Sequence, residues 1–172
     1  MIKALPIVLS AVVMAFGLFF CKKTSEKNGK ADIQQAVPTP EINEYPYLRL
    51  IMTDGSVRTA RELPTKSVLL IYFPDCDHCQ REAKEISSHA AAFESYQVYF
   101  ISTAPFTDIE RFAKDYKLTG YANIHFVRTE MPDVVNNFGA IPTPSVYVYS
   151  SEKKLIKAFK GETKIEEIIV HL

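Results

Sequence analysis

The sequence predicts an α/β fold, with a central sheet flanked by helices. Continuous apolar runs at residues 67–73 and 97–103 are typical of strands buried on both faces. Between such runs, apolar residues recur at helical spacing, and the expected order of elements is β-β-β-α-β-α-β-α-β-β-α. The chain has 172 residues, 47% of them hydrophobic, which is enough to bury the core of one domain.

The N-terminal segment, residues 1–20, is expected to be a signal peptide rather than part of the fold. Lys3 precedes an uncharged run over residues 4–20, which is short for a membrane span of about 20 residues. Cys21 follows this run, as in bacterial lipoprotein signals, where cleavage leaves a cysteine that carries lipid. Phe20 departs from the small residue usual before that cysteine. The alternative is an uncleaved anchor, and both place the domain outside the cytoplasmic membrane.

The next segment, residues 21–44, is rich in Lys, Ser, Asn, Pro and Thr and predicts a flexible tether. The domain is expected to span residues 45–172. Lys and Arg together number 20, as do Asp and Glu, so the formal net charge is zero. Because phosphate binding needs a basic face, this balance argues against a nucleic-acid partner.

The domain is expected to begin with a β-hairpin. Residues 48–52 and 57–63 flank an Asp54-Gly55 turn, and glycine accepts the positive φ that such turns require. After the strand at 67–73, an apolar stripe at helical spacing predicts a helix. The residues of this stripe are Cys79, Ala83, Ile86, Ala90 and Phe93.

The remaining elements follow the same logic of apolar runs and helical stripes. Thr107-Asp108 is expected to cap a helix with the stripe Ile109, Phe112, Ala113 and Tyr116. Gly139 is a C-cap signal for a short helix. The other predicted elements are strands at 97–103, 124–129, 145–150 and 155–159, a helix at 132–138, and a last helix lined by Ile165, Ile168, Ile169 and Leu172.

The cysteine spacing indicates redox chemistry. The chain has three cysteines, and if Cys21 carries lipid, only the pair in Cys76-Asp77-His78-Cys79 remains. A structural disulfide framework needs several cysteines spread along the chain. A bond between Cys76 and Cys79 would close a small loop, which constrains the unfolded chain little. The pair therefore predicts a redox-active disulfide, with no other cofactor.

The two sulfurs are expected to have different roles. Cys76 lies where a buried strand ends and a helix begins, and the positive end of the helix dipole favours a thiolate there. Cys76 is therefore the expected attacking sulfur. Cys79 lies one helical turn further on, within bonding reach, on the apolar stripe. It is expected to be buried and to resolve the mixed disulfide with a substrate.

Zinc binding is the main alternative for a C-x-x-C motif. Such sites use a second pair, or two histidines at fixed spacing. This chain has no second pair, and its histidines, His78, His89, His125 and His171, form no H-x₃₋₅-H pattern. No metal site is therefore expected, and His78 is interpreted as a redox-tuning residue.

Residues 73–79, which follow a buried strand, resemble the active site of a thioredoxin fold. Residues 47–160 resemble the TlpA/ResA-type thiol–disulfide oxidoreductases of bacterial envelopes. The resemblance implies a thioredoxin-like fold with a central mixed sheet flanked by helices and an added N-terminal β-hairpin. It also implies that Glu82 assists proton transfer, although its position alone predicts a solvated helix residue.

A second matching element is Ile141-Pro142-Thr143-Pro144-Ser145, which precedes a predicted strand. Thioredoxin folds place a cis-proline there, against the cysteines, and cis bonds are essentially restricted to X–Pro. Pro144 fits this position better than Pro142. Thr143, the residue before it, would then pair through its backbone with an extended substrate.

Three features depart from the family's pattern. His78 stands where the family often has proline, and a histidine in the spacer favours a more oxidising disulfide. The chain has no tryptophan, although one usually precedes the motif, and Lys84 lies where the family has a kinking proline. Asp77 and His78, the two spacer residues, are therefore the expected redox-tuning residues.

These features predict a membrane-tethered thiol–disulfide oxidoreductase, acting as a reductase. Its expected partners are disulfide-containing client proteins, an upstream thiol electron donor, and the membrane through lipid on Cys21. The expected location is the bacterial cell envelope, lipid-anchored and facing the periplasm. A peroxiredoxin-like thiol peroxidase is one alternative, although Phe73 stands where that family has threonine. A copper-binding thioredoxin-fold chaperone and a domain used only for interaction are the others.

Overall fold

The computed structural model describes residues 45–64 and 66–172. The predicted signal peptide (residues 1–20), the tether (21–44) and the lipidation site Cys21 lie outside the described residues. Within the described part of the chain, no helix is long and apolar enough to cross a membrane.

Seven strands of the described chain form one mixed sheet in the order β2-β1-β5-β4-β3-β6-β7. β3, β4 and β5 are parallel, whereas β1, β6 and β7 pair antiparallel with their neighbours. The strands are β1 (Arg49–Ile51), β2 (Val57–Thr59), β3 (Ser67–Ile71), β4 (Gln97–Ser102), β5 (Ile124–Arg128), β6 (Ser145–Tyr149) and β7 (Leu155–Lys160).

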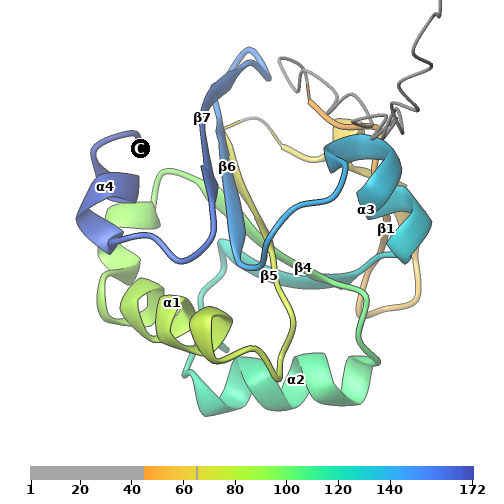
Figure 1. Ribbon diagram of the computed structural model, residues 1–172, viewed down its shortest axis with the longest axis horizontal. Helices are drawn as coiled ribbons and strands as arrows, with labels where there is room; N and C mark the ends of the chain where they lie inside the picture. Colours follow the sequence, from red (N-terminus) through yellow and green to blue (C-terminus); the bar gives the residue numbers. More distant parts are fainter. Residues whose placement is uncertain (1–44, 65) are drawn as a thin grey trace, which may run out of the picture. The chain divides into compact units, whose positions relative to one another are not determined.

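Helices cover both faces of this sheet (Figure 1). Side chains of α1, α2 and α4 pack with Val68 and Leu70 of β3 on one face. Side chains of α3 pack with Leu69 and Ile71 on the other. The helical segments are η1 (Ala60–Glu62), α1 (Asp77–Ser88), η2 (Ala90–Phe93), α2 (Phe106–Asp115), α3 (Met131–Phe138) and α4 (Ile165–Ile169).

The central strand β3 explains where the cysteine motif lies. All five of its residues are buried, as its continuous apolar run predicts for a strand covered on both faces. β4 pairs with one side of it in parallel, and β6 pairs with the other side antiparallel. The end of β3 therefore meets the start of β6, which brings the motif and the proline loop to the same edge of the sheet.

The thioredoxin-like α/β fold, the order of elements and the N-terminal hairpin are confirmed. One predicted boundary is wrong, because the helix of the long apolar stripe ends at Ser88. His89 has φ −118° and ψ 24°, and its ring Nδ1 lies 2.9 Å from the carbonyl oxygen of Glu85, which belongs to the last turn. Ala90 and Phe93 remain buried because η2 continues along the same face.

Two smaller differences concern the ends of elements. The second hairpin strand ends at Thr59 instead of residue 63, because the backbone turns into η1, where the Glu62 carboxylate accepts the Thr59 N–H at 2.8 Å. α2 begins at Phe106, so Thr107 and Asp108 lie inside its first turn and do not cap it. Asp108 instead pairs with Arg111 at 2.8 Å.

Candidate active site

Cys76 lies at the start of α1, where the chain turns after β3. Its N–H donates to the carbonyl of Phe73 at 3.2 Å, and its carbonyl accepts the first helical bond, from Gln80, at 3.0 Å. Cys76 is the N-cap of α1, and its Sγ accepts the N–H of Cys79 at 3.4 Å. The sulfur therefore lies at the positive end of the helix dipole, where negative charge is stabilised.

Cys79 is in a different environment from Cys76. It is 2% exposed and packs in the core, whereas Cys76 is half-buried, and both are free thiols. Burial, together with the hydrogen bond to Cys76, raises the pKa of the Cys79 thiol to about 12. Cys79 therefore holds its proton at neutral pH, and it needs a base before it can act as a nucleophile.

The proline loop meets the motif at Cys76. The Thr143–Pro144 peptide bond is cis, and Pro144 is buried just before β6. Cys76 Sγ lies 3.7 Å from the Thr143 carbonyl oxygen and 4.0 Å from the Thr143 hydroxyl. The fold thus brings together the cysteine motif and the proline loop that sequence analysis identified, although Cys76 and Thr143 lie 67 residues apart.

Glu82 is buried, in contrast to the solvated position that its place in the helix predicts. It is 2% exposed, on the same face of α1 as Cys79. Its Oε2 accepts the N–H of Thr163 at 3.2 Å, while its Oε1 is buried without a hydrogen-bond partner. Burial raises the pKa of this carboxyl to about 7, against the opposing hydrogen bond from Thr163. Near neutral pH, the group can therefore exchange a proton.

The spacer residues differ in their contacts. Asp77 is the first residue of α1 and is exposed. His78 is also exposed, but its Nδ1 lies 2.5 Å from Oε2 of Glu162, which also pairs with Arg81. Sequence analysis did not identify Arg81 or Glu162 as site residues, because their contact joins residues 81 positions apart and leaves no local pattern.

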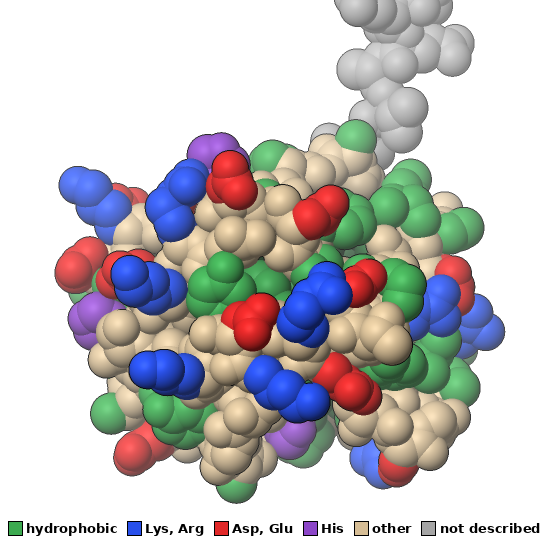
Figure 2. All heavy atoms as spheres, turned by 90° about the horizontal axis from the view of Figure 1, so that it is seen from below, with side chains coloured by type: hydrophobic (Ala, Val, Ile, Leu, Met, Phe, Trp, Pro, Cys, Tyr) green, Lys and Arg blue, Asp and Glu red, His purple; other side chains and the backbone are tan. Residues whose placement is uncertain are grey.

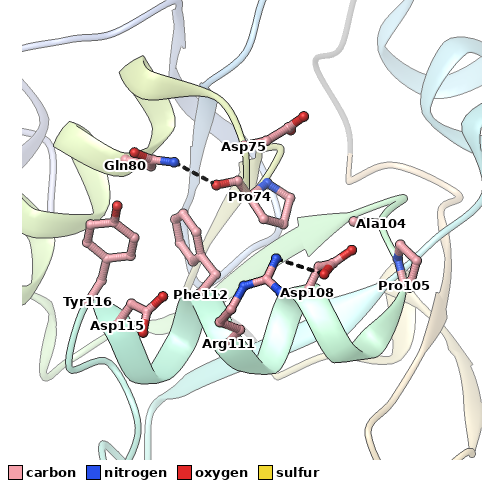
Figure 3. Close-up of a pocket in the computed structure, with 10 residues that line it drawn as sticks. All are labelled: Pro74, Asp75, Gln80, Ala104, Pro105, Asp108, Arg111, Phe112, Asp115 and Tyr116. Atoms are coloured by element: carbon pink, nitrogen blue, oxygen red, sulfur yellow. Dashed lines mark hydrogen bonds and ion pairs between the residues drawn. The ribbon is translucent and has the colours of Figure 1, made fainter.

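Two hollows flank the motif. A groove of about 620 Å³ separates Pro74 and Asp75 from α2, and its floor includes Phe112 and Tyr116 (Figure 3). Gln80 fixes the rim of this groove by donating to the Pro74 carbonyl at 3.0 Å. An apolar hollow of about 210 Å³ lies on the other side, lined by residues that include Phe73, Thr143 and the α3 residues Met131 and Val135.

The histidines outside the motif have structural contacts. His89 ends α1, His125 stacks on Tyr99 with ring centroids 4.8 Å apart, and His171 packs against Phe159. Within residues 45–64 and 66–172, no group of three or more His, Cys, Asp or Glu side chains gathers to hold a metal ion.

The sequence matches the AhpC/TSA family over residues 36–158. No curated protein gives a significant match. Among solved structures, a secreted Mycobacterium tuberculosis disulfide oxidoreductase homologous to E. coli DsbE is similar, with TM-score 0.61, 18% identity, and coverage of 73% of this chain and 93% of that one. A domain of a possible thiol-disulfide isomerase from Cytophaga hutchinsonii has TM-score 0.61, 22% identity, and coverage of 74% and 89%.

Arabidopsis thaliana ScoI, solved with copper bound, is also similar, with TM-score 0.57, 14% identity, and coverage of 75% of this chain and 97% of that one. At these identities the solved structures establish a shared thioredoxin-like fold. The fold alone does not separate disulfide chemistry from copper binding, because it supports both among these neighbours.

Proposed function

The chain belongs to the AhpC/TSA family, and on that premise we propose that it is a thiol–disulfide oxidoreductase in which Cys76 attacks client disulfides and Cys79 resolves them. The family and the fold support a thioredoxin-like oxidoreductase. The observation that carries the proposal is the pairing of a half-buried Cys76 at a helix N-terminus with a buried Cys79 directly behind it.

The reaction consists of two thiol–disulfide exchanges. The Cys76 thiolate attacks one sulfur of a client disulfide, a mixed disulfide forms, and the other client sulfur leaves as a thiolate and takes up a proton. Cys79 then loses its proton and attacks the Cys76 sulfur. The Cys76–Cys79 disulfide forms, and the second client sulfur leaves as a thiolate. The client gains two electrons, which an upstream dithiol donor returns to the pair.

Glu82 is the proposed proton acceptor for Cys79. The thiol cannot attack while it holds its proton, and its raised pKa of about 12 keeps the proton in place in water-poor surroundings. The carboxyl of Glu82 is buried on the same helix face and titrates near neutrality. Its unpartnered Oε1 is available to take up a proton, directly or through water.

The client is proposed to bind as an extended segment beside Thr143. In this arrangement the Thr143 backbone lies within reach of Cys76, so a segment bound there presents its disulfide to the attacking sulfur. The groove beside α2 and the apolar hollow beside α3 lie on either side, and together they offer both polar and apolar surface to the client's flanking residues. The proposed clients are envelope proteins, reduced in the manner of TlpA/ResA-type enzymes.

Reduction of insulin by dithiothreitol tests this function. The protein is expected to accelerate the reaction, and Cys76→Ser is expected to abolish the acceleration. Cys79→Ser should instead accumulate a mixed disulfide with the client, visible by mass spectrometry, because the resolving step is lost. Cys21→Ser serves as the matched cysteine control and should keep full activity. A Cys76→Ser protein as active as the parent contradicts the proposal.

Membrane attachment through lipid on Cys21 is part of the same proposal, and it is supported by the sequence of the N-terminal segment. In bacterial cells, the parent is expected in the membrane fraction with a lipid mass on Cys21. Cys21→Ser should lose that mass. A parent protein found without lipid on Cys21 contradicts this part and leaves the redox proposal untouched.

A thiol peroxidase is the second candidate, because the family match favours it. Its sequence pattern places threonine three residues before the reactive cysteine, where this chain has Phe73. Hydrogen peroxide consumption with dithiothreitol separates the two functions. We expect a rate no greater than that of an equal concentration of free thiol, and a rate well above it favours the peroxidase.

A further inference from the structure

The loop between β7 and α4 contacts three parts of the active site through three successive residues. The N–H of Gly161 donates to the Pro144 carbonyl at 2.8 Å. The side chain of Glu162 reaches His78 and Arg81, and the N–H of Thr163 donates to the Glu82 carboxyl at 3.2 Å. This loop therefore links the proline loop, the motif spacer and the buried carboxyl.

Glu162 and Arg81 form a bidentate ion pair. Arg81 Nε lies 2.7 Å from Oε1, and Arg81 Nη2 lies 2.8 Å from Oε2. Both side chains are partly exposed, and exposed pairs contribute little to stability. The two parallel bonds do fix the orientation of the charges. Arg81, followed by His78, lowers the pKa of Glu162 to about 2, so the carboxylate remains charged at neutral pH.

His78 shares the same carboxylate. Its Nδ1 lies 2.5 Å from Oε2 of Glu162 and 2.7 Å from Nη2 of Arg81. A carboxylate only accepts hydrogen bonds, so Nδ1 must carry the proton that fills the shorter contact. The imidazole therefore donates to Glu162. The Arg81 guanidinium also donates to the Glu162 oxygens, and not to the histidine ring.

The charge of Arg81 acts on the attacking sulfur. The pKa of Arg81 is raised chiefly by its hydrogen bond to Glu162, and the charges of Glu162, Asp77 and Cys76 add to this. Arg81 follows the N-cap residue Cys76 by five positions in α1, and a positive charge near the start of the helix attracts a negatively charged sulfur there. The Glu162 carboxylate opposes that effect because it carries the opposite charge beside the guanidinium. Glu162 also raises the pKa of Glu82, so its field reaches the buried carboxyl.

From these contacts we propose that Glu162 is a positioning residue that sets the dithiol–disulfide equilibrium of Cys76 and Cys79, by neutralising Arg81 and holding the His78 imidazole. This inference rests on the proposed thiol–disulfide function and identifies what tunes it. With the carboxylate in place, Arg81 adds little net charge near the sulfur, and the thiolate gains little from it. The pair is then more reducing than its histidine-containing spacer suggests.

Equilibration with glutathione tests the proposal. In this reaction the protein disulfide and two glutathione thiols exchange for the protein dithiol and one glutathione disulfide. At pH 8, above the titration of Glu82, Glu162→Gln is expected to shift the equilibrium three- to tenfold toward the dithiol. Arg81→Gln should shift it by a similar factor toward the disulfide. For this two-electron couple, tenfold corresponds to about 30 mV.

The controls are matched in charge to the residues that are tested. Lys84→Gln removes an exposed cation from α1, and Glu167→Gln removes an exposed carboxylate from α4. Both should stay within twofold of the parent. Glu162→Asp, which keeps the charge, should shift the equilibrium less than Glu162→Gln. The double variant Arg81→Gln/Glu162→Gln should return close to the parent, because the two opposite shifts cancel. Circular dichroism at the assay temperature shows whether each variant is folded.

The outcomes separate the two proposals. If the parent forms no Cys76–Cys79 disulfide with glutathione, the proposed function fails. If the parent titrates normally but both single variants shift in the same direction, the role of Glu162 is overturned. Shifts no larger than those of the Lys84 and Glu167 controls overturn it as well.

Discussion

At the scale of single residues, burial raises the pKa of two side chains on one face of α1. Burial makes the Cys79 thiol harder to deprotonate than a solvated cysteine, and it moves the titration of Glu82 close to neutrality. Burial is the largest cause for both groups, and the hydrogen bond to Cys76 adds to it at Cys79. The raised pKa values of the resolving thiol and of its proposed proton acceptor therefore have the same main cause, which is the packing of a single helix face.

The stability of the protein is expected to depend on pH through Glu82. Its pKa is raised from the ordinary value of 4.5 to about 7 in the folded state, so the folded protein binds this proton more tightly than the unfolded chain. The resulting stability is fully present below pH 4.5 and is lost as pH rises to about 7. The shift corresponds to at most about 3 kcal/mol.

Urea unfolding of the parent and Glu82→Gln between pH 4 and 8 measures this effect. Glutamine keeps the shape but cannot ionise, so the variant should gain stability relative to the parent as pH rises. Glu162, whose folded-state pKa is lowered to about 2, contributes stability that is fully present above pH 4.5 and is lost only as pH falls toward 2, so its contribution hardly changes across this range. A difference between the two proteins that stays constant across the range contradicts the raised pKa of Glu82.

At the scale of elements, local sequence patterns predicted the strands and helix ends that depend on neighbouring residues. The continuous run at residues 67–73 predicts a strand covered on both faces, and every residue of β3 is buried. Gly139 ends α3 with φ 73°, as its position after a short helix predicts. The motif at the start of α1 follows from the same reasoning, because a strand and a helical stripe meet there.

The elements that sequence patterns missed depend on contacts from elsewhere in the fold. The long apolar stripe is continuous, yet the helix ends at Ser88, because apolar spacing shows which face is buried and not whether the backbone stays helical. The sequence pattern predicts a solvated Glu82, but in the fold Thr163, in the loop before α4, contacts its carboxyl. The pairing of Arg81 with Glu162 has no sequence signal, since it depends on how the loop after β7 lies against α1.

At the scale of the whole domain, the sheet order brings together three segments that carry the site. β3 leads into the motif, β6 follows the proline loop, and β7 leads into the loop of Glu162, and these three strands are neighbours in the sheet. On the face that Figure 2 shows, basic and acidic side chains are interspersed, with apolar side chains between them. With a net charge of zero, long-range steering of a charged client is expected to be weak.

The relative stability of the oxidised and reduced protein reports the direction of the reaction. By thermodynamic linkage, if folding favours the disulfide over the dithiol, the oxidised protein has the larger free energy of unfolding. If folding favours the dithiol, the reduced protein has the larger one. Strong oxidants of this chemistry are more stable when reduced, because the folded protein stabilises their thiolate. Here the Cys79 N–H supports the Cys76 thiolate, but Glu162 offsets the charge of Arg81.

We therefore expect the oxidised protein to be the more stable form by about 1–2 kcal/mol, a five- to thirtyfold change in the ratio of folded to unfolded protein. Urea unfolding of the full chain, once with the disulfide formed and once in excess dithiothreitol, gives this difference from the two midpoints at equal slope. Cys79→Ser, which cannot form the bond, should unfold at the same midpoint under both conditions. A reduced form more stable than the oxidised one would show that the pair oxidises its clients, because the fold would then favour the dithiol.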